Sequence, residues 1–542
     1  MLALALVMLC ACSGKDKGST VSVIKVGTGT ITGNFNPFYA VEEGDCAVLD
    51  QVYSSIQRKG AGNNLINDLG SIAYEYESDE KVKYTVTVRN DLSFSNGSPV
   101  TIDDVIFWYY FLADASYDGV YKDFYLNDIE GIKEYYYDDV NYASVISNLN
   151  NNESQIKSYI KRNYADGIDV TSISGIKRVD DYTCTVLFNS RNINAVSQLN
   201  ATIVSKAFCS ADYVKGDAGK IKAMTKLAMG CGPYYLSDYN EKDKTAVLLA
   251  NKYSLSAPSV FTKAEFTDIT SYDDPAKVIK DGKVNIISGT ATPGFVSSLG
   301  NGVKCCFTNA PEYTSLFISA SVPLEARKIL LGLYSSDDII DKEFGGYYTK
   351  LVRPLSVRFS EYPAGAEPYY QSTLRGAFLS GLVSELNAYC RGDENSLDYR
   401  LLSAFSQNLS QFNVKLNVKA CKDAEFNSAV KSGKAQIWID SVPDGDTCDK
   451  YEYYNTKGKY NYVGISDPDL DTLTQRLRRA TGFTDRKTIA SELLKCIMEN
   501  AVEYPLYQIQ IADAYDTSVI SPESLIDASE YDGYSDMLAF LY

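Results

Sequence analysis

The 542-residue sequence contains no histidine. Histidine is the base of Ser-His-Asp and Cys-His nucleophile pairs, and it provides the zinc ligands of HExxH metallopeptidases. These enzyme classes are therefore excluded, together with every metal site that needs an imidazole ligand. The chain also has no side chain whose unperturbed pKa lies near neutrality. Enzymes that use paired carboxylates, lysine or tyrosine remain possible.

Basic residues are scarce as well, because 52 lysines and arginines face 69 acidic residues, for a net charge of −17. Nucleic-acid phosphates need a basic face, so we expect no nucleic-acid partner. A composition of 45% hydrophobic and 22% charged residues is typical of a globular chain. The length predicts two or three lobes.

No C-x-x-C pair occurs among the 12 cysteines, which disfavours a cysteine metal site or a thioredoxin-type site. We expect no metal and no cofactor. The cysteines from Cys46 onward either form disulfides in an exported protein or stay free and buried, and their spacing leaves both possibilities open. Tyrosine is abundant, at 43 residues, and its flat ring with a hydroxyl tip suits a ligand cleft as well as an ordinary core.

The first 20 residues, MLALALVMLCACSGKDKGST, contain an apolar run that is too short to span a bilayer. The run fits the apolar core of a secretory signal. The segment Leu9-Cys10-Ala11-Cys12 resembles a bacterial lipobox, which implies that Cys12 is acylated and that residues 13–20 form a tether. A buried apolar strand is the alternative interpretation.

The most informative stretch is residues 84–111, YTVTVRNDLSFSNGSPVTIDDVIFWYYF. Apolar residues alternate with threonines from Tyr84 to Val88, which predicts a half-buried strand. Asn-Asp and Asn-Gly pairs then indicate turns. Thr101 stands three residues before Asp104, which predicts a capping box at the start of a helix. No step in this series of elements performs a reaction.

The same stretch resembles the signature of the family-5 extracellular solute-binding proteins, the peptide-binding components of ABC importers. The order of Tyr, Arg, Asp, Phe-Ser, Gly-x-Pro-Val-Thr and Asp-Asp-Val agrees. Further segments are similar to family patterns: GIKRVDDYTCTV from Gly175, GCGPYY from Gly230, GKVNI from Gly282 and WIDSVPDGD from Trp438.

The resemblance implies an α/β, two-lobe periplasmic-binding-protein-like (type II) fold with an extra subdomain on the first lobe. Residues 1–20 are then the signal and tether. The expected division of the rest is lobe I at 21–55, 200–272 and 502–542, the subdomain at 56–199, and lobe II at 273–501.

Further elements are predicted within and beside lobe II. Strands are expected over 435–440 and 502–507, the latter returning the chain to lobe I. The expected helices span 324–334, 370–388, 470–480 and 485–500.

In the family, an acidic residue after a lobe II strand receives the ligand's α-amino group, because a desolvated ammonium needs a carboxylate partner. Here Ser441 holds the place of the first family aspartate and Asp440 comes one residue early, while Asp444 and Asp446 keep the register. We favour Asp440 for the amine and Asp444 next, with Asp446 also possible. Trp438 either stacks on the ligand, seals the hinge or belongs to the core. A solvated acidic turn is the alternative for the loop.

Four other residues are candidates for the cleft. Phe35, Asn36 and Tyr39 lie in an entry loop, where turn residues packed on the sheet edge are the alternative. Tyr313 precedes a predicted strand and is placed in the cleft by analogy with the family.

The resemblance implies a receptor that captures an oligopeptide or dipeptide, closes around it and delivers it to ABC permease subunits, without turnover. We expect a monomer, lipid-anchored on the outer face of the bacterial cell membrane. Without histidine, direct nickel–imidazole ligation and pH-triggered release are not expected. The alternatives are a glycan-active hydrolase that uses two carboxylates, or a sensor or adhesin that borrows the fold.

Overall fold

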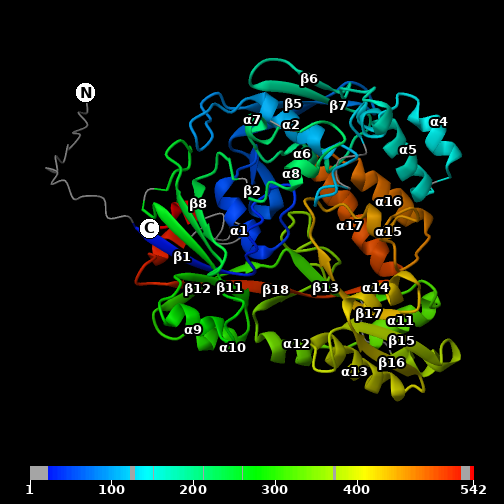
Figure 1. Ribbon diagram of the computed structural model, residues 1–542. Coiled ribbons are helices and arrows are strands. Elements are labelled where there is room, and N and C mark those ends of the chain that lie inside the picture. Colours follow the sequence, from blue (N-terminus) through cyan, green and yellow to red (C-terminus); the bar gives the residue numbers. More distant parts are fainter. Residues whose placement is uncertain are drawn as a thin grey trace, which may run out of the picture.

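One strand, β18 (Glu503–Asp516), belongs to both halves of a twelve-stranded sheet. Its N-terminal end pairs with β13 (Glu312–Ile318), and its C-terminal end pairs with β11 (Ile286–Thr290) and β12 (Val303–Asn309). Figure 1 shows β18 in red, running across the molecule from one lobe to the other. The computed structural model describes residues 22–122, 128–150, 152–210, 213–226, 228–258, 260–369, 374–525 and 538–542.

Lobe I is the half of the sheet with strand order β18-β11-β1-β10-β9-β8. Its first strand, β1, is parallel to β10 and β11, and the side chains of Ile24 and Val26 on it are fully buried. Besides β11, β12 and the end of β18, the elements of lobe I are β1 (Val23–Thr28), α1 (Glu43–Val52), β8 (Tyr234–Asn240), β9 (Thr245–Ala250), β10 (Lys263–Asp268), α9 (Pro275–Lys280) and α10 (Pro293–Ser298).

Lobe II is the other half of the sheet, with strand order β16-β15-β17-β13-β18. The strands β15, β16 and β17 are parallel, which requires helical crossovers between them. Besides β13 and the start of β18, its elements are α11 (Leu324–Leu333), α12 (Asp337–Phe344), β14 (Tyr348–Lys350), β15 (Glu385–Arg391), α13 (Leu397–Ser410), β16 (Lys415–Cys421), α14 (Asp423–Lys431), β17 (Ile437–Pro443), α15 (Tyr451–Tyr454), α16 (Pro468–Arg478) and α17 (Phe483–Glu499).

A separate four-stranded sheet, β4-β5-β7-β6, forms the core of the subdomain. The side chains of β5 alternate between buried and half-buried as predicted, and Thr101 and Asp104 form the predicted capping box of α2. The subdomain and its neighbouring helices comprise β2 (Gln57–Gly60), β3 (Asn64–Asn67), β4 (Gly70–Tyr76), β5 (Val82–Val88), α2 (Ile102–Leu112), α3 (Ile132–Tyr137), α4 (Tyr142–Asn148), α5 (Glu153–Asp166), β6 (Ile176–Arg178), β7 (Thr183–Phe188), α6 (Ala195–Leu199), α7 (Lys206–Cys209) and α8 (Gly219–Lys222).

The α/β two-lobe architecture of the type II binding proteins is confirmed. The pairing of β11 with β1 nevertheless places that strand in the sheet of lobe I, whereas we expected lobe II to begin at residue 273. The chain reaches the strands of lobe II with β13, directly after Ala310 and Pro311. We therefore propose that lobe II begins near residue 312.

The predicted helix over 370–388 is wrong for the part that the structure describes. Leu374–Gly381 is a 3₁₀ helix, and Glu385–Arg391 is strand β15. β15 lies between β16 and β17, and this pairing buries Leu386, Ala388 and Cys390. Tertiary pairing has overridden the local apolar spacing.

The ten cysteines from Cys46 to Cys496 are free, which answers the question left open by their spacing. Within the described ranges, no helix has the length and apolar character needed to cross a membrane. Cys12 and the rest of the expected signal lie outside the described residues.

Candidate functional site: the cavity between the subdomain and lobe II

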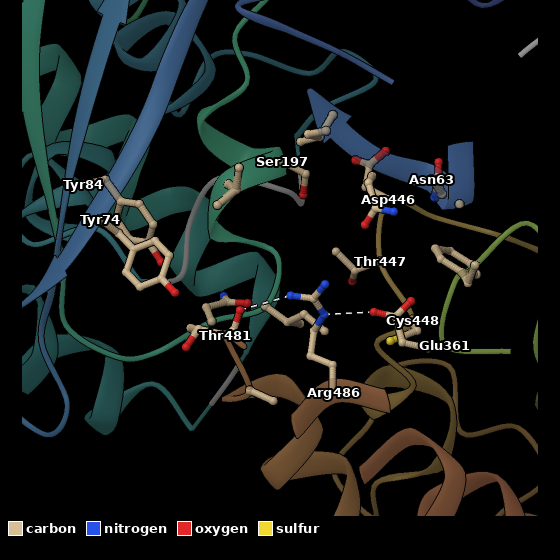
Figure 2. A pocket seen from close by; sticks show the side chains of 18 residues that line it. Asn63, Tyr74, Tyr84, Ser197, Glu361, Asp446, Thr447, Cys448, Thr481 and Arg486 are labelled. Atoms are coloured by element: carbon tan, nitrogen blue, oxygen red, sulfur yellow. Dashed lines mark hydrogen bonds and ion pairs between the residues drawn. The ribbon is translucent and has the colours of Figure 1, made fainter. Parts of the chain in front are cut away.

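A cavity of about 210 Å³ lies where the subdomain faces lobe II. Its walls come from the β2–β3 hairpin, β4, β5 and the turn into α6 on one side, and from three loops and the start of α17 on the other (Figure 2). The lining residues are Gly62, Asn63, Asn64, Leu65, Tyr74, Tyr84, Asn192, Ile193, Val196, Ser197, Phe359, Glu361, Asp446, Thr447, Cys448, Ala480, Thr481 and Arg486.

An ion pair crosses one side of this cavity. Arg486 donates through Nε to Glu361 Oε1 at 2.9 Å and through a terminal nitrogen to the carbonyl oxygen of Thr481 at 3.1 Å. The Glu361 side chain is only 6% exposed and that of Arg486 is 21% exposed. Because Arg486 lies in the first turns of α17, where the helix dipole disfavours a cation, the Glu361 carboxylate compensates for that position.

Asp446 supplies a second carboxylate, and it is more accessible. It forms an ion pair with Lys59 of β2, with 3.4 Å between the charged groups, and about two fifths of each side chain is exposed. Tyr74 and Tyr84 lie across the cavity from Asp446 (Figure 2). Burial raises the pKa of the Tyr84 hydroxyl, so this tyrosine stays neutral and able to donate a hydrogen bond. The cavity therefore offers one carboxylate for a cation and flat neutral rings opposite it.

Hydrogen bonds across the cleft hold the cavity shut. Asn194 donates through Nδ2 to the Asp449 carboxylate at 3.0 Å, and the Ile193 amide donates to the Arg478 carbonyl oxygen at 2.6 Å. On the other side of the cavity, the amide of Ser360 donates to the carbonyl oxygen of Gly62 at 3.4 Å. These pairs join residues of the subdomain to residues of lobe II, so the subdomain stands closed against lobe II.

Of the acidic residues in the predicted loop, the structure brings only Asp446 to the cavity. The Asp444 carboxylate is turned into the protein, where it accepts a hydrogen bond from Ser356 Oγ at 3.0 Å and pairs with Arg358 at 3.3 Å. Burial raises the pKa of the Asp444 carboxyl despite the nearby guanidinium. Asp440 forms an ion pair with Arg391 inside lobe II, and burial raises its carboxyl pKa as well.

The aromatic candidates belong to the core of lobe II. Trp438 is 3% exposed and stacks on Phe317, with ring centroids 5.5 Å apart. The Tyr313 hydroxyl donates to the carbonyl oxygen of Pro354 at 3.0 Å and accepts from Lys450 Nζ at 2.9 Å. Neither side chain lines the cavity in the part of the chain that the structure describes.

The entry-loop candidates are buried in lobe I. Phe35 is fully buried and packs edge-on against Tyr239, with 5.2 Å between ring centroids. Asn36 is also fully buried, and its Nδ2 donates to the Ile221 carbonyl oxygen at 2.7 Å. Tyr39 is 9% exposed and lies under the Lys222 ammonium. All three serve the packing of the loop and lie outside the described lining of the cavity.

Sequence reasoning missed Glu361, Arg486 and the tyrosines of β4 and β5. Glu361 lies between the family-like segments at Gly282 and Trp438, and Tyr84 belongs to the alternating strand, which performs no reaction by itself. No local pattern marks these residues, since they meet only when the subdomain closes on lobe II.

Comparison with known proteins gives one family and many similar structures. The family model described as "Bacterial extracellular solute-binding proteins, family 5 Middle" matches residues 70–462. A comparison with curated proteins finds no match.

Three solved structures illustrate the shared fold. AppA of Clostridium difficile has a TM-score of 0.73 at 13% identity, covering 96% of this chain and 100% of that one. The ABC transporter substrate-binding protein CtaP of Listeria monocytogenes gives 0.69 at 18% identity, covering 91% and 94%. The oligopeptide-binding protein AppA of Bacillus subtilis, solved with a nonapeptide, gives 0.65 at 14% identity, covering 96% and 98%.

Two lobes that share a crossover strand, with a subdomain that encloses a cavity against lobe II, are the architecture of a type II solute-binding protein. With the family match over residues 70–462, the chain belongs to the family-5 bacterial extracellular solute-binding proteins, which confirms the resemblance seen in the sequence.

Proposed function

We propose that this protein captures a short peptide in the cavity between the subdomain and lobe II and delivers it, unchanged, to an ABC permease. The observation that carries the proposal is the cavity itself, which places the half-exposed Asp446 carboxylate opposite two tyrosine rings. The nonapeptide bound to Bacillus subtilis AppA supports peptide as the ligand class. The ligand shifts the population toward the closed form, which is the form that docks on the permease.

The α-ammonium group of the peptide is assigned to Asp446. A buried ammonium requires a carboxylate partner. The Lys59 ammonium that pairs with Asp446 is exposed to solvent, so a ligand ammonium can take its place. Asp440 and Asp444, which the sequence favoured, already have guanidinium partners within lobe II. The cavity volume of about 210 Å³ is below the roughly 300–1,000 Å³ of typical ligand pockets, which favours a short peptide.

Attachment to the membrane remains part of the proposal. The lipobox-like segment implies acylation of Cys12, which would hold a monomeric receptor on the outer face of the cell membrane. Intact-mass measurement of the protein extracted from membranes tests this, because lipidation of Cys12 adds the mass of the lipid and cleavage of the Ala11–Cys12 bond removes the residues before it.

Residues 21–542 should be purified and screened against peptide pools by thermal shift, since a ligand that binds only the native state raises the melting temperature. Mass spectrometry of the peptides after incubation then separates binding from hydrolysis. Stabilisation by short peptides that are recovered intact supports the proposal. Cleaved peptides, or a response to glycans and to no peptide, would overturn it.

A further inference from the structure

Phe359 stands between two cavities. Its side chain, 5% exposed, lines both the inner cavity of about 210 Å³ and an outer pocket of about 620 Å³. The outer pocket is lined by Val352, Val357 and Tyr362 among other residues of the same loop. The turn that carries Phe359 is therefore the partition between the two spaces.

Contacts from both sides hold this partition in place. On the side of α17, Arg486 pairs with Glu361 at 2.9 Å. On the side of the subdomain, Asn64 Nδ2 donates to Ser360 Oγ at 3.1 Å. The turn is thus pinned to a helix of lobe II and to the β2–β3 hairpin while the lobes are closed.

The two spaces differ in charge. The inner cavity contains Asp446 together with the mutually neutralised Glu361 and Arg486. The outer pocket contains the lysines Lys350 and Lys487, and Lys487 follows Arg486 directly on α17. Lys350 is paired with Asp337 at 2.5 Å, while the exposed Lys487 ammonium lies 5.9 Å from the centroid of the Phe483 ring. A peptide has the matching polarity, with an ammonium at one end and a carboxylate at the other.

We propose that Phe359 is the residue that limits ligand length, and that the outer pocket is a subsite for the carboxyl end of a longer peptide once the Phe359 ring is out of the way. This inference rests on the proposed function, since it assumes a peptide whose amino end lies at Asp446. The Lys487 ammonium is the group that receives the carboxylate. The intact protein accordingly prefers short peptides, and loss of the ring lets longer ones bind.

The test compares the best dipeptide from the screen with the same dipeptide extended by three alanines, measured by calorimetry on the wild-type protein and on Phe359→Ala. We expect the wild type to favour the dipeptide by about tenfold or more, and Phe359→Ala to remove this difference by gaining affinity for the longer peptide. Phe378→Ala is the matched control, because that ring is 71% exposed and lies outside both linings.

The lysine is tested with the longer peptide as a free acid and as a C-terminal amide. In the Phe359→Ala background, Lys487→Gln should remove the preference for the free acid. Lys495→Gln, on the same helix with a side chain 66% exposed, should leave it unchanged. If Phe359→Ala fails to fold, Asn64→Ala is the second variant, because it removes the hydrogen bond to Ser360 without changing the core. It should also gain affinity for the longer peptide, by a smaller factor.

The outcomes separate the two proposals. A wild-type protein that binds no peptide defeats the proposed function. Equal affinity of the wild type for both lengths, or a folded Phe359→Ala that keeps the dipeptide and gains nothing for the longer peptide, overturns the role of Phe359 alone. An acid preference that survives Lys487→Gln overturns the assignment of the carboxylate.

Discussion

Glu361 and Arg486 form an ion pair, with 2.9 Å between Oε1 and Nε, that ties the cavity-lining turn of lobe II to the first turns of α17. The glutamate is almost fully buried and the arginine largely so. The pair therefore fixes one wall of the cavity and contributes no net charge to it. Asp446, whose Lys59 partner is exposed to solvent, is then the carboxylate proposed to bind the ligand's cationic end.

Breaking this pair should cost stability. Arg486→Met leaves the Glu361 carboxylate buried without its partner, so we expect the free energy of unfolding to fall by about 3 kcal/mol. The double variant with Glu361→Gln should recover part of that loss, because the unpaired charge is gone. Urea unfolding at neutral pH measures both, with Lys495→Met as the control on the exposed face of α17. A double variant no more stable than Arg486→Met would contradict this account.

Asp446 and Asp440 should respond differently to removal of their charge. Asp446→Asn is expected to lower the affinity for a free-amine peptide by about tenfold or more and to leave an N-acetylated peptide unaffected. Asp440→Asn should leave affinity unchanged, because the Asp440 carboxylate pairs with Arg391 within lobe II and does not line the cavity. Calorimetric titration with the two forms of one peptide distinguishes them. If only Asp440→Asn weakened binding of the free-amine peptide, the amine-binding role would belong to Asp440.

Closure should depend on Asn194. Its amide donates to Asp449 across the cleft, a contact that exists only while the lobes are closed. Hydrogen bonds to charged groups contribute about 1.5–3 kcal/mol, so Asn194→Ala should weaken peptide binding by about tenfold or more. Small-angle scattering should show a larger radius of gyration for the variant without ligand. Asn240→Ala, in the exposed β8–β9 turn, is the control and should change neither quantity.

Stability should fall as pH rises through the pKa of Asp398. Burial, helped by the nearby Asp440 carboxylate and opposed by Arg391, raises the pKa of the Asp398 carboxyl to about 6. The folded state therefore holds this proton more tightly than the unfolded chain, and stability present at low pH is lost as the group ionises. Between pH 5 and pH 8 the loss from this group is about 1 kcal/mol.

The variant Asp398→Asn isolates that contribution. It should show a smaller fall in the free energy of unfolding between the two pH values than the wild type, measured by urea denaturation at each pH. Identical slopes for the two proteins would show that the Asp398 carboxyl does not titrate in this range.

Local sequence patterns predicted the elements whose conformation depends mainly on interactions between residues close in sequence. The alternation from Tyr84 to Val88 became β5, and the Thr101–Asp104 pair became the capping box of α2, since each depends on neighbours within a few residues. The stretch 385–391 failed the same reasoning because its strand forms only between β16 and β17. The spacing of its apolar residues does not indicate which strands it will pair with.

The sequence by itself determined the family and the two-lobe fold, because a long ordered signature and repeated strand and helix patterns are local properties of the chain. Only the tertiary structure decided which carboxylate faces the cavity. Arg391 forms an ion pair with Asp440, and Arg358 forms one with Asp444, although both arginines come from distant segments of the chain. The β2–β3 hairpin contacts Asp446 only when the subdomain closes on lobe II. The partners of a charge are set by packing between lobes, which no spacing along one strand encodes.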